Sequence, residues 1–113
     1  MKSKLRIGPY ISDGRREVVF LGGQPVWMAV YYGQVNDENV DSVYSFLQRA
    51  LREAPPEFPV RGPAAFTEGQ FSYRNAYEGD VMRFWGQETI HADGRLVYTA
   101  RYGGGLVDRR SGD

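Results

Sequence analysis

The feature that most constrains the fold of this chain is a segment that occurs twice. Residues 17–33 read EVVFLGGQPVWMAVYYG, and residues 88–104 read ETIHADGRLVYTARYGG. In each copy β-branched and aromatic residues flank a turn that contains glycine, which is typical of a β-hairpin. With no gap between the copies, the identical positions are Glu17 and Glu88, Gly23 and Gly94, Val26 and Val97, Ala29 and Ala100, Tyr31 and Tyr102, and Gly33 and Gly104.

These matches support two interpretations. We expect an internal repeat whose hairpins are related by a pseudo-two-fold axis, but two unrelated hairpins share a similar composition. In the second arm Trp27, Ala29 and Tyr31 share one side, and apolar residues also occupy the other side. The pattern therefore predicts a sheet with both faces covered.

The segment between the hairpins has the period of an amphipathic helix, predicted at about residues 39–54. Asn36 or Asn39 can cap its start, and Pro55-Pro56 ends it. Phe46 lies off the apolar stripe, where it can meet a partner. The stripe consists of Val40, Val43, Tyr44, Leu47, Ala50, Leu51 and Ala54.

The segment PPEFPVRGP follows the helix and should be a stiff extended connector, because proline fits neither a helix interior nor a central strand. A middle hairpin is predicted next, with arms at residues 70–77 and 81–91. The final strand should end at Gly103-Gly104-Gly105. No lysine followed by serine or threonine, and no helix, comes after these glycines, so they do not predict a phosphate loop.

These elements predict a single α+β domain over residues 1–113, with frayed ends at about 1–5 and 108–113. The expected architecture is an antiparallel sheet of about five to six strands with one helix packed on it. The single helix covers one face and leaves the other available to a partner, such as a second copy of the chain. We therefore expect a homodimer.

Composition excludes several classes of function. The 14 basic and 14 acidic residues cancel, so the isolated domain is not expected to bind nucleic acid or a membrane surface. The chain contains no cysteine, which excludes disulfides and thiolate chemistry. It shows neither a signal peptide nor a long apolar run, and we expect a soluble cytoplasmic protein.

Arg61 is the strongest candidate for a binding residue. Pro59, Gly62 and Pro63 stiffen the backbone around it and would fix the direction of its guanidinium, as recognition of a carboxylate or phosphate requires. The alternative is a structural salt bridge that holds the connector. The other residues predicted to line a site for a small anionic or aromatic ligand are Trp27, Tyr73, Trp85, Tyr98 and Arg101, together with Glu17 and Glu88.

The signals for catalysis are weaker. His91 is the only histidine, so a multi-histidine metal site is excluded. Glu17 and Glu88 occupy equivalent repeat positions and would form a carboxylate pair if the axis brought them together, although solvated or arginine-paired side chains are more common there. We expect no catalytic residue, metal or cofactor.

The ordered segments PVWMAVYYG, FLQRAL, PVRGPAAFTEGQFSYRN, GDVMRFWGQETI and GRLVYTARYGGG resemble an uncharacterised bacterial and archaeal family of unknown function. The resemblance covers Glu17 to Leu106. In that family the domain occurs alone or behind an Xre-type helix-turn-helix, which implies by analogy a unit that senses or dimerises. It supplies no catalytic residues.

The combined prediction is a non-enzymatic module, homodimeric, that binds a small ligand or a protein and serves as a sensor or regulatory accessory. One alternative is a small enzyme that acts on a phosphorylated or carboxylated metabolite through Glu17, Glu88 or His91. The other is a purely structural protein that docks a partner.

Overall fold

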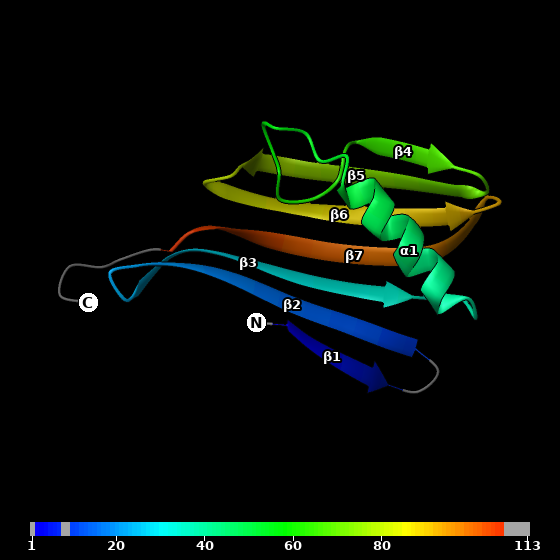
Figure 1. The fold of residues 1–113 in the computed structure, drawn as a ribbon, viewed down its shortest axis with the longest axis horizontal. Helices are drawn as coiled ribbons and strands as arrows, with labels where there is room; N and C mark the ends of the chain where they lie inside the picture. Colours follow the sequence, from blue (N-terminus) through cyan, green and yellow to red (C-terminus); the bar gives the residue numbers. More distant parts are fainter. Residues whose placement is uncertain (1, 8–9, 108–113) are drawn as a thin grey trace.

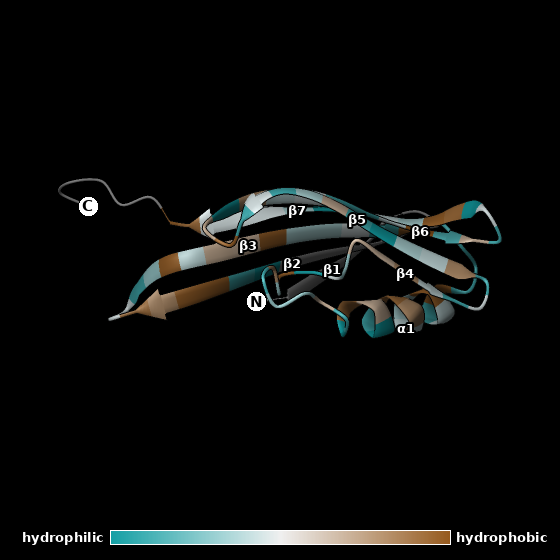
Figure 2. Ribbon diagram, turned by 90° about the horizontal axis from the view of Figure 1, so that it is seen from above, coloured by the Kyte–Doolittle hydropathy of each residue, from teal (hydrophilic) through white to brown (hydrophobic). Residues whose placement is uncertain are grey.

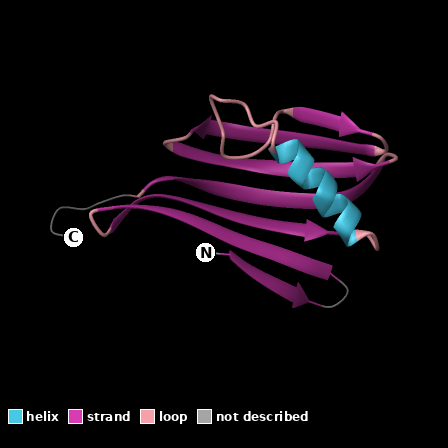
Figure 3. Cartoon of the chain, viewed as in Figure 1, coloured by secondary structure: helices cyan, strands magenta, loops and turns pink. Residues whose placement is uncertain are grey.

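The computed structural model of the chain describes residues 2–7 and 10–107, with side chains described from residue 16 to residue 107. Its strands form one antiparallel sheet in the order β1-β2-β3-β7-β6-β5-β4 (Figure 1; Figure 3). The elements are β1 (Lys2–Ile7), β2 (Tyr10–Leu21), β3 (Gln24–Val35), α1 (Val40–Leu51), β4 (Ala65–Glu68), β5 (Phe71–Asp80), β6 (Arg83–Ala92) and β7 (Arg95–Leu106).

The predicted α+β class is confirmed, with an antiparallel sheet and one helix in the described part of the chain. The sheet has seven strands because β1 and β4 each add an edge strand. Residues 2–5, which the sequence suggests are frayed, belong to β1, whereas the predicted frayed end at 108–113 lies outside the described residues. No helix among residues 2–7 and 10–107 is long and apolar enough to cross a membrane.

The two similar hairpins lie side by side at the centre of the sheet. Both turns use backbone with positive φ, at Gly22-Gly23 in the first and at Asp93-Gly94 in the second, as tight hairpin turns require. Strand β3 of the first hairpin pairs with β7 of the second, and Tyr31 lies opposite Tyr102. The sheet therefore places the two similar strands next to each other.

One face of the sheet, called here the covered face, is packed against α1 and the connector at residues 52–64. Figure 2 shows the sheet arching over α1, and Figure 1 shows the connector loop beside the helix. Under the helix, Tyr73, Ile90 and Tyr98 form the core with the buried side of α1. Under the connector, Phe58 stacks on Tyr77 and meets Phe84 edge to face. The covered face thus has two adjoining apolar clusters.

Two local predictions about α1 need correction. The helix ends at Leu51, and residues 52–54 follow it as turns or irregular chain rather than continuing it to 54. Phe46 is fully buried and does not face a partner, because β4 and β5 widen the sheet beneath it and supply Phe66 and Phe71 as ring neighbours.

No element among the described residues covers the opposite face, called here the open face, so the second covering layer that the pattern predicts does not come from this part of the chain. Residues directly opposite each other on neighbouring strands share a face of the sheet. By this alternation Val30, Tyr32 and Trp85 lie on the open face, and each is about half exposed. The face therefore presents large apolar side chains to solvent.

The predicted end of the last strand at Gly103-Gly104-Gly105 is also wrong, since β7 continues through these glycines to Leu106. A side chain at Gly104 would clash with the backbone oxygen of Met28, and Gly105 has a φ of +139°. These two glycines let β7 pass its neighbours closely while it keeps its pairing.

Glycines on the two faces should respond differently to substitution. A Cβ on Gly86 would overlap the ring of Tyr102, whereas a Cβ on Gly103 would meet nothing closer than 3.4 Å. We expect Gly86→Ala to lower the free energy of unfolding in urea by about 1–3 kcal/mol through overpacking. Gly103→Ala, the matched control, should change it little or raise it by up to about 1 kcal/mol. Equal losses in both variants would contradict this assignment.

Candidate functional site

A buried ion pair lies at the centre of the covered face. Glu88, on β6, is 0% exposed, and Arg61 reaches it from the connector. The Nε of Arg61 donates to Oε2 of Glu88 at 3.0 Å, and its Nη2 donates to Oε1 at 2.5 Å. The hydroxyl of Tyr73 also donates to this carboxylate. Glu88 is therefore satisfied by two side chains from different segments.

Further hydrogen bonds extend this cluster to the backbone of the connector. The Gly62 N–H donates to the Tyr73 hydroxyl at 3.2 Å, and the Asn75 amide donates to the Gly62 carbonyl at 3.1 Å. The Tyr102 hydroxyl donates in turn to Asn75 Oδ1 at 2.7 Å. The connector is thus bound to the sheet by a continuous polar network.

Burial and the charges in the cluster shift the pKa values of its members. Burial acts to lower the pKa of Arg61, but the charge and hydrogen bonds of Glu88 outweigh burial and raise it, so the guanidinium stays charged. Burial raises the pKa of Tyr31 and that of Tyr102 to about 12. The Arg61 guanidinium lies 4.9 Å from the centre of the Tyr31 ring, which adds a cation–π contact.

The structure thus brings together three predicted site residues, Arg61, Tyr73 and Glu88. Their contacts hold the connector on the sheet, so they form a structural anchor. Both carboxylate oxygens of Glu88 accept hydrogen bonds from inside the chain. This matches the salt-bridge alternative that the sequence left open for Arg61.

Trp27 and Tyr98 also lie on the covered face, but each packs elsewhere. The Trp27 indole N–H donates to the Val81 carbonyl at 2.7 Å, and its ring contacts Phe84. Tyr98 is buried against the edge of the Tyr44 ring. Both rings are therefore parts of the apolar core.

Glu17, Glu88 and His91 do not form one site. Glu17 is exposed on β2, while Glu88 is buried on β6. By the strand alternation His91 lies on the open face, with the sheet between it and Glu88. In the part of the chain with described side chains, no group of three histidine, aspartate or glutamate residues could hold a metal ion.

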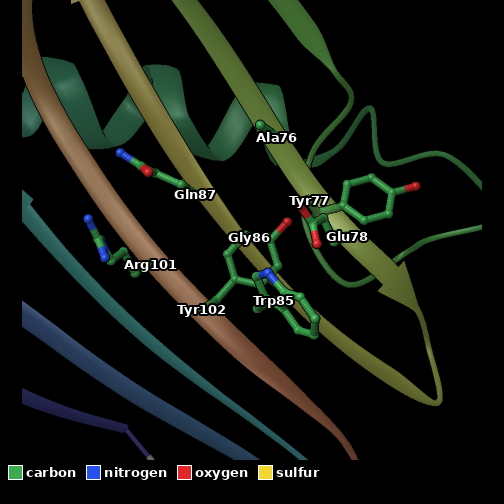
Figure 4. A pocket seen from close by; sticks show the side chains of 8 residues that line it. All are labelled: Ala76, Tyr77, Glu78, Trp85, Gly86, Gln87, Arg101 and Tyr102. Atoms are coloured by element: carbon green, nitrogen blue, oxygen red, sulfur yellow. The ribbon is translucent and has the colours of Figure 1, made fainter.

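The remaining two candidates, Trp85 and Arg101, lie together on the open face. They line a pocket of about 430 Å³ with Ala76, Glu78 and Gln87. Figure 4 shows this pocket across β5, β6 and β7, with α1 behind the strands. Trp85 is 54% exposed, and among the described residues Arg101 forms no ion pair. The pocket thus combines an exposed ring, an amide, a cation and the carboxylate of Glu78.

A smaller hollow of about 150 Å³ adjoins Arg101 on its other side. It is lined by Tyr32 and Gln34 from β3 and by residues 99–101 of β7. Gln34, Tyr32 and Gln87 were missed from the sequence, because only the pairing of β3 and β6 with β7 shows that they flank Arg101. Alternation within each strand was the available signal, but it does not give the order of the strands.

Removing one member of the buried pair should destabilise the fold. Glu88→Gln leaves the Arg61 charge buried without a carboxylate, and we expect a loss of about 3–5 kcal/mol in the free energy of unfolding. The double variant Arg61→Met with Glu88→Gln should lose less than the sum of the single losses.

The exposed pair of Arg49 and Glu68 is the matched control, since Glu68→Gln should cost less than about 1 kcal/mol. Urea unfolding of Glu88→Gln, Arg61→Met, the double variant and Glu68→Gln measures these values. A Glu88→Gln loss no larger than that of Glu68→Gln would contradict the anchoring role.

Alkaline pH should destabilise the fold through Tyr31 and Tyr102. A group whose pKa is higher in the folded chain gives its full contribution below the unfolded value and loses it as the pH rises through the folded value. The free energy of unfolding should therefore fall between pH 10 and about pH 12. This fall should be shallower in Tyr31→Phe and Tyr102→Phe than in Tyr32→Phe, the control on the open face. The same slope in all variants would count against this origin.

Comparison with curated proteins and with solved structures gives no significant match. A family model, described as a domain of unknown function, matches residues 11–107. The match spans β2 to β7 and so includes the buried ion pair and the open-face pocket. The chain belongs to the DUF5680 family.

Proposed function

We propose that the domain is a non-enzymatic module that binds a small anionic, aromatic ligand on the open face. The single observation that carries this proposal is the pocket that Arg101 and the half-exposed ring of Trp85 both line. An arginine with no internal carboxylate partner can form paired hydrogen bonds with a ligand carboxylate or phosphate. Trp85 offers a flat surface for a ring, and Gln87 can donate and accept hydrogen bonds.

The covered face supports the same conclusion by contrast. Arg61 is 8% exposed and already paired, so it has no free access to a dissolved anion. Glu88 is equally enclosed, and neither Glu17 nor His91 lies beside it, so these three residues form no acid–base pair that faces a substrate. What supports a binding role over an enzymatic one is that Glu17, Glu88 and His91 do not line the pocket.

Native mass spectrometry and thermal unfolding test the proposal together. We expect a panel of aromatic carboxylates and nucleotides to contain a ligand that raises the free energy of unfolding by about 2.7 kcal/mol at 100 times its Kd. Arg101→Gln should remove the effect and Trp85→Leu should reduce it by about half. Both variants should leave the unliganded fold unchanged, because both side chains are exposed. Arg74→Gln, an exposed arginine outside the pocket lining, is the control. A panel with no ligand that depends on Arg101 would overturn the proposal.

We also propose that the domain forms a homodimer and serves as a sensor or regulatory accessory. Exposed apolar residues support the homodimer. They lie at the end of the sheet that holds the β2–β3 turn and are Val19, Phe20, Leu21, Met82 and Leu106. Apolar clusters of this kind mark contact surfaces. The same mass spectra report the oligomeric state, and a monomer at all concentrations would contradict the dimer.

We further infer that the hairpins β2–β3 and β6–β7 form an internal repeat about a local two-fold axis. Pairing supports this inference, since Glu17 lies opposite Ala29 and their counterparts Glu88 and Ala100 are also opposite. The register shift after Val19 recurs after its counterpart Ile90. The axis would pass between Tyr31 and Tyr102.

A further inference from the structure

Arg101 lines both hollows on the open face, which gives the proposed binding site two halves. On one side lies the pocket with Trp85 and Gln87, and on the other lies the hollow with Tyr32 and Gln34. The two hollows therefore have a single cation between them.

Each half offers the same set of chemical groups. Trp85 and Tyr32 are large rings that are 54% and 49% exposed, and each has a glutamine two residues away on its own strand. Residues two apart on a strand point to the same face. A ring that stacks on a base and an amide that reaches its edge are the two components with which proteins recognise unstacked bases.

The strand order fixes the spacing of the two rings. Gln87 and Tyr32 lie directly opposite Arg101 on its two sides, so Trp85 and Tyr32 stand on the strands that flank β7. Two strand spacings separate these flanking strands by about 10 Å. Stacked rings lie only about 4.5–7 Å apart between centroids. Trp85 and Tyr32 therefore do not stack on each other, and two ring systems joined at Arg101 can each contact one of them in its own hollow.

The charges favour a linking group with one negative charge. Among the residues whose side chains are described, Arg101 is the only basic one that lines either hollow, and Glu78 places a carboxylate in the larger one. A terminal phosphate carries nearly two negative charges at neutral pH and would be repelled by Glu78. A phosphodiester carries one charge and suits a single arginine.

Gly103 gives an independent reason to place a ligand here. It lies between Val30 and Trp85 in one row across the strands, next to Arg101 on the same face. Neither a positive φ nor a close neighbour requires glycine at this position, in contrast to Gly104 and Gly105. Glycine inside a strand weakens the strand, so its presence fits a place where a ligand approaches the backbone closely.

We propose that the ligand is a dinucleotide, with its phosphodiester on Arg101 and its two bases on Trp85 and Tyr32. This inference rests on the proposed function and specifies the ligand class of the same site. The site holds the bases apart from each other, each on its own protein ring.

The test compares adenylyl-(3′→5′)-adenosine with AMP and adenosine by isothermal titration calorimetry. We expect the dinucleotide to bind at least tenfold more tightly than AMP. Because a base stacked on a ring contributes substantially, Tyr32→Leu and Trp85→Leu should each weaken dinucleotide binding by about tenfold. Tyr32→Phe keeps the ring and should retain binding, and Arg101→Gln should lose it. Arg74→Gln should bind as the unmodified chain does, and circular dichroism confirms that each variant is folded.

Each result decides the inference. Tenfold preference for the dinucleotide with sensitivity at both rings supports it. Equal affinity for AMP, or Tyr32→Leu without effect while Trp85→Leu weakens binding, overturns the two-part site and leaves the proposed function intact. Dinucleotide binding that is absent at millimolar concentration also overturns the inference, and the wider ligand panel then decides the proposed function separately.

Discussion

The pairing of Arg61 with Glu88 is the interaction on which the rest of the structure depends. The connector at residues 52–64 contains no strand or helix. It is held on the sheet by this ion pair, by the hydrogen bonds at Gly62 and by the packing of the Phe58 ring. A carboxylate buried at 0% exposure is costly unless it is fully paired. The three hydrogen bonds from Arg61 and Tyr73 meet this requirement, and they fix the connector at one position over β6.

This arrangement separates the stabilising contacts on the covered face from the proposed binding site on the open face. The covered face holds most of the aromatic residues together with the buried titratable groups, and its polar atoms are largely satisfied from within. The open face receives side chains from the same strands in alternate positions, but no layer lies over them in the described residues. A side chain such as Arg101 can therefore be substituted with little effect on the core.

Glycine contributes to both faces for different reasons. Gly33 and Gly86 lie on the covered face beneath the rings of Tyr98 and Tyr102, where a methyl group would not fit. The glycines leave room for these rings, so the rings lie close to the backbone of the neighbouring strands. Gly103 on the open face has no such constraint, and the space above it belongs to solvent or to a ligand.

The sequence by itself determined the elements whose signals are local. Hairpin turns at Gly22-Gly23 and Asp93-Gly94 follow from backbone preferences. The stripe from Val40 to Ala54 predicts the helix, although the helix itself ends at Leu51. The α+β class also follows from such patterns. So does the expectation that the guanidinium of Arg61 pairs with an anionic group, either of a ligand or within the chain. Only the tertiary structure decided that Arg61 meets Glu88, that Phe46 is buried, and that Arg101 stands between Tyr32 and Gln87. These outcomes depend on the order of strands in the sheet, and contacts between distant segments leave no periodic signal in a single sequence.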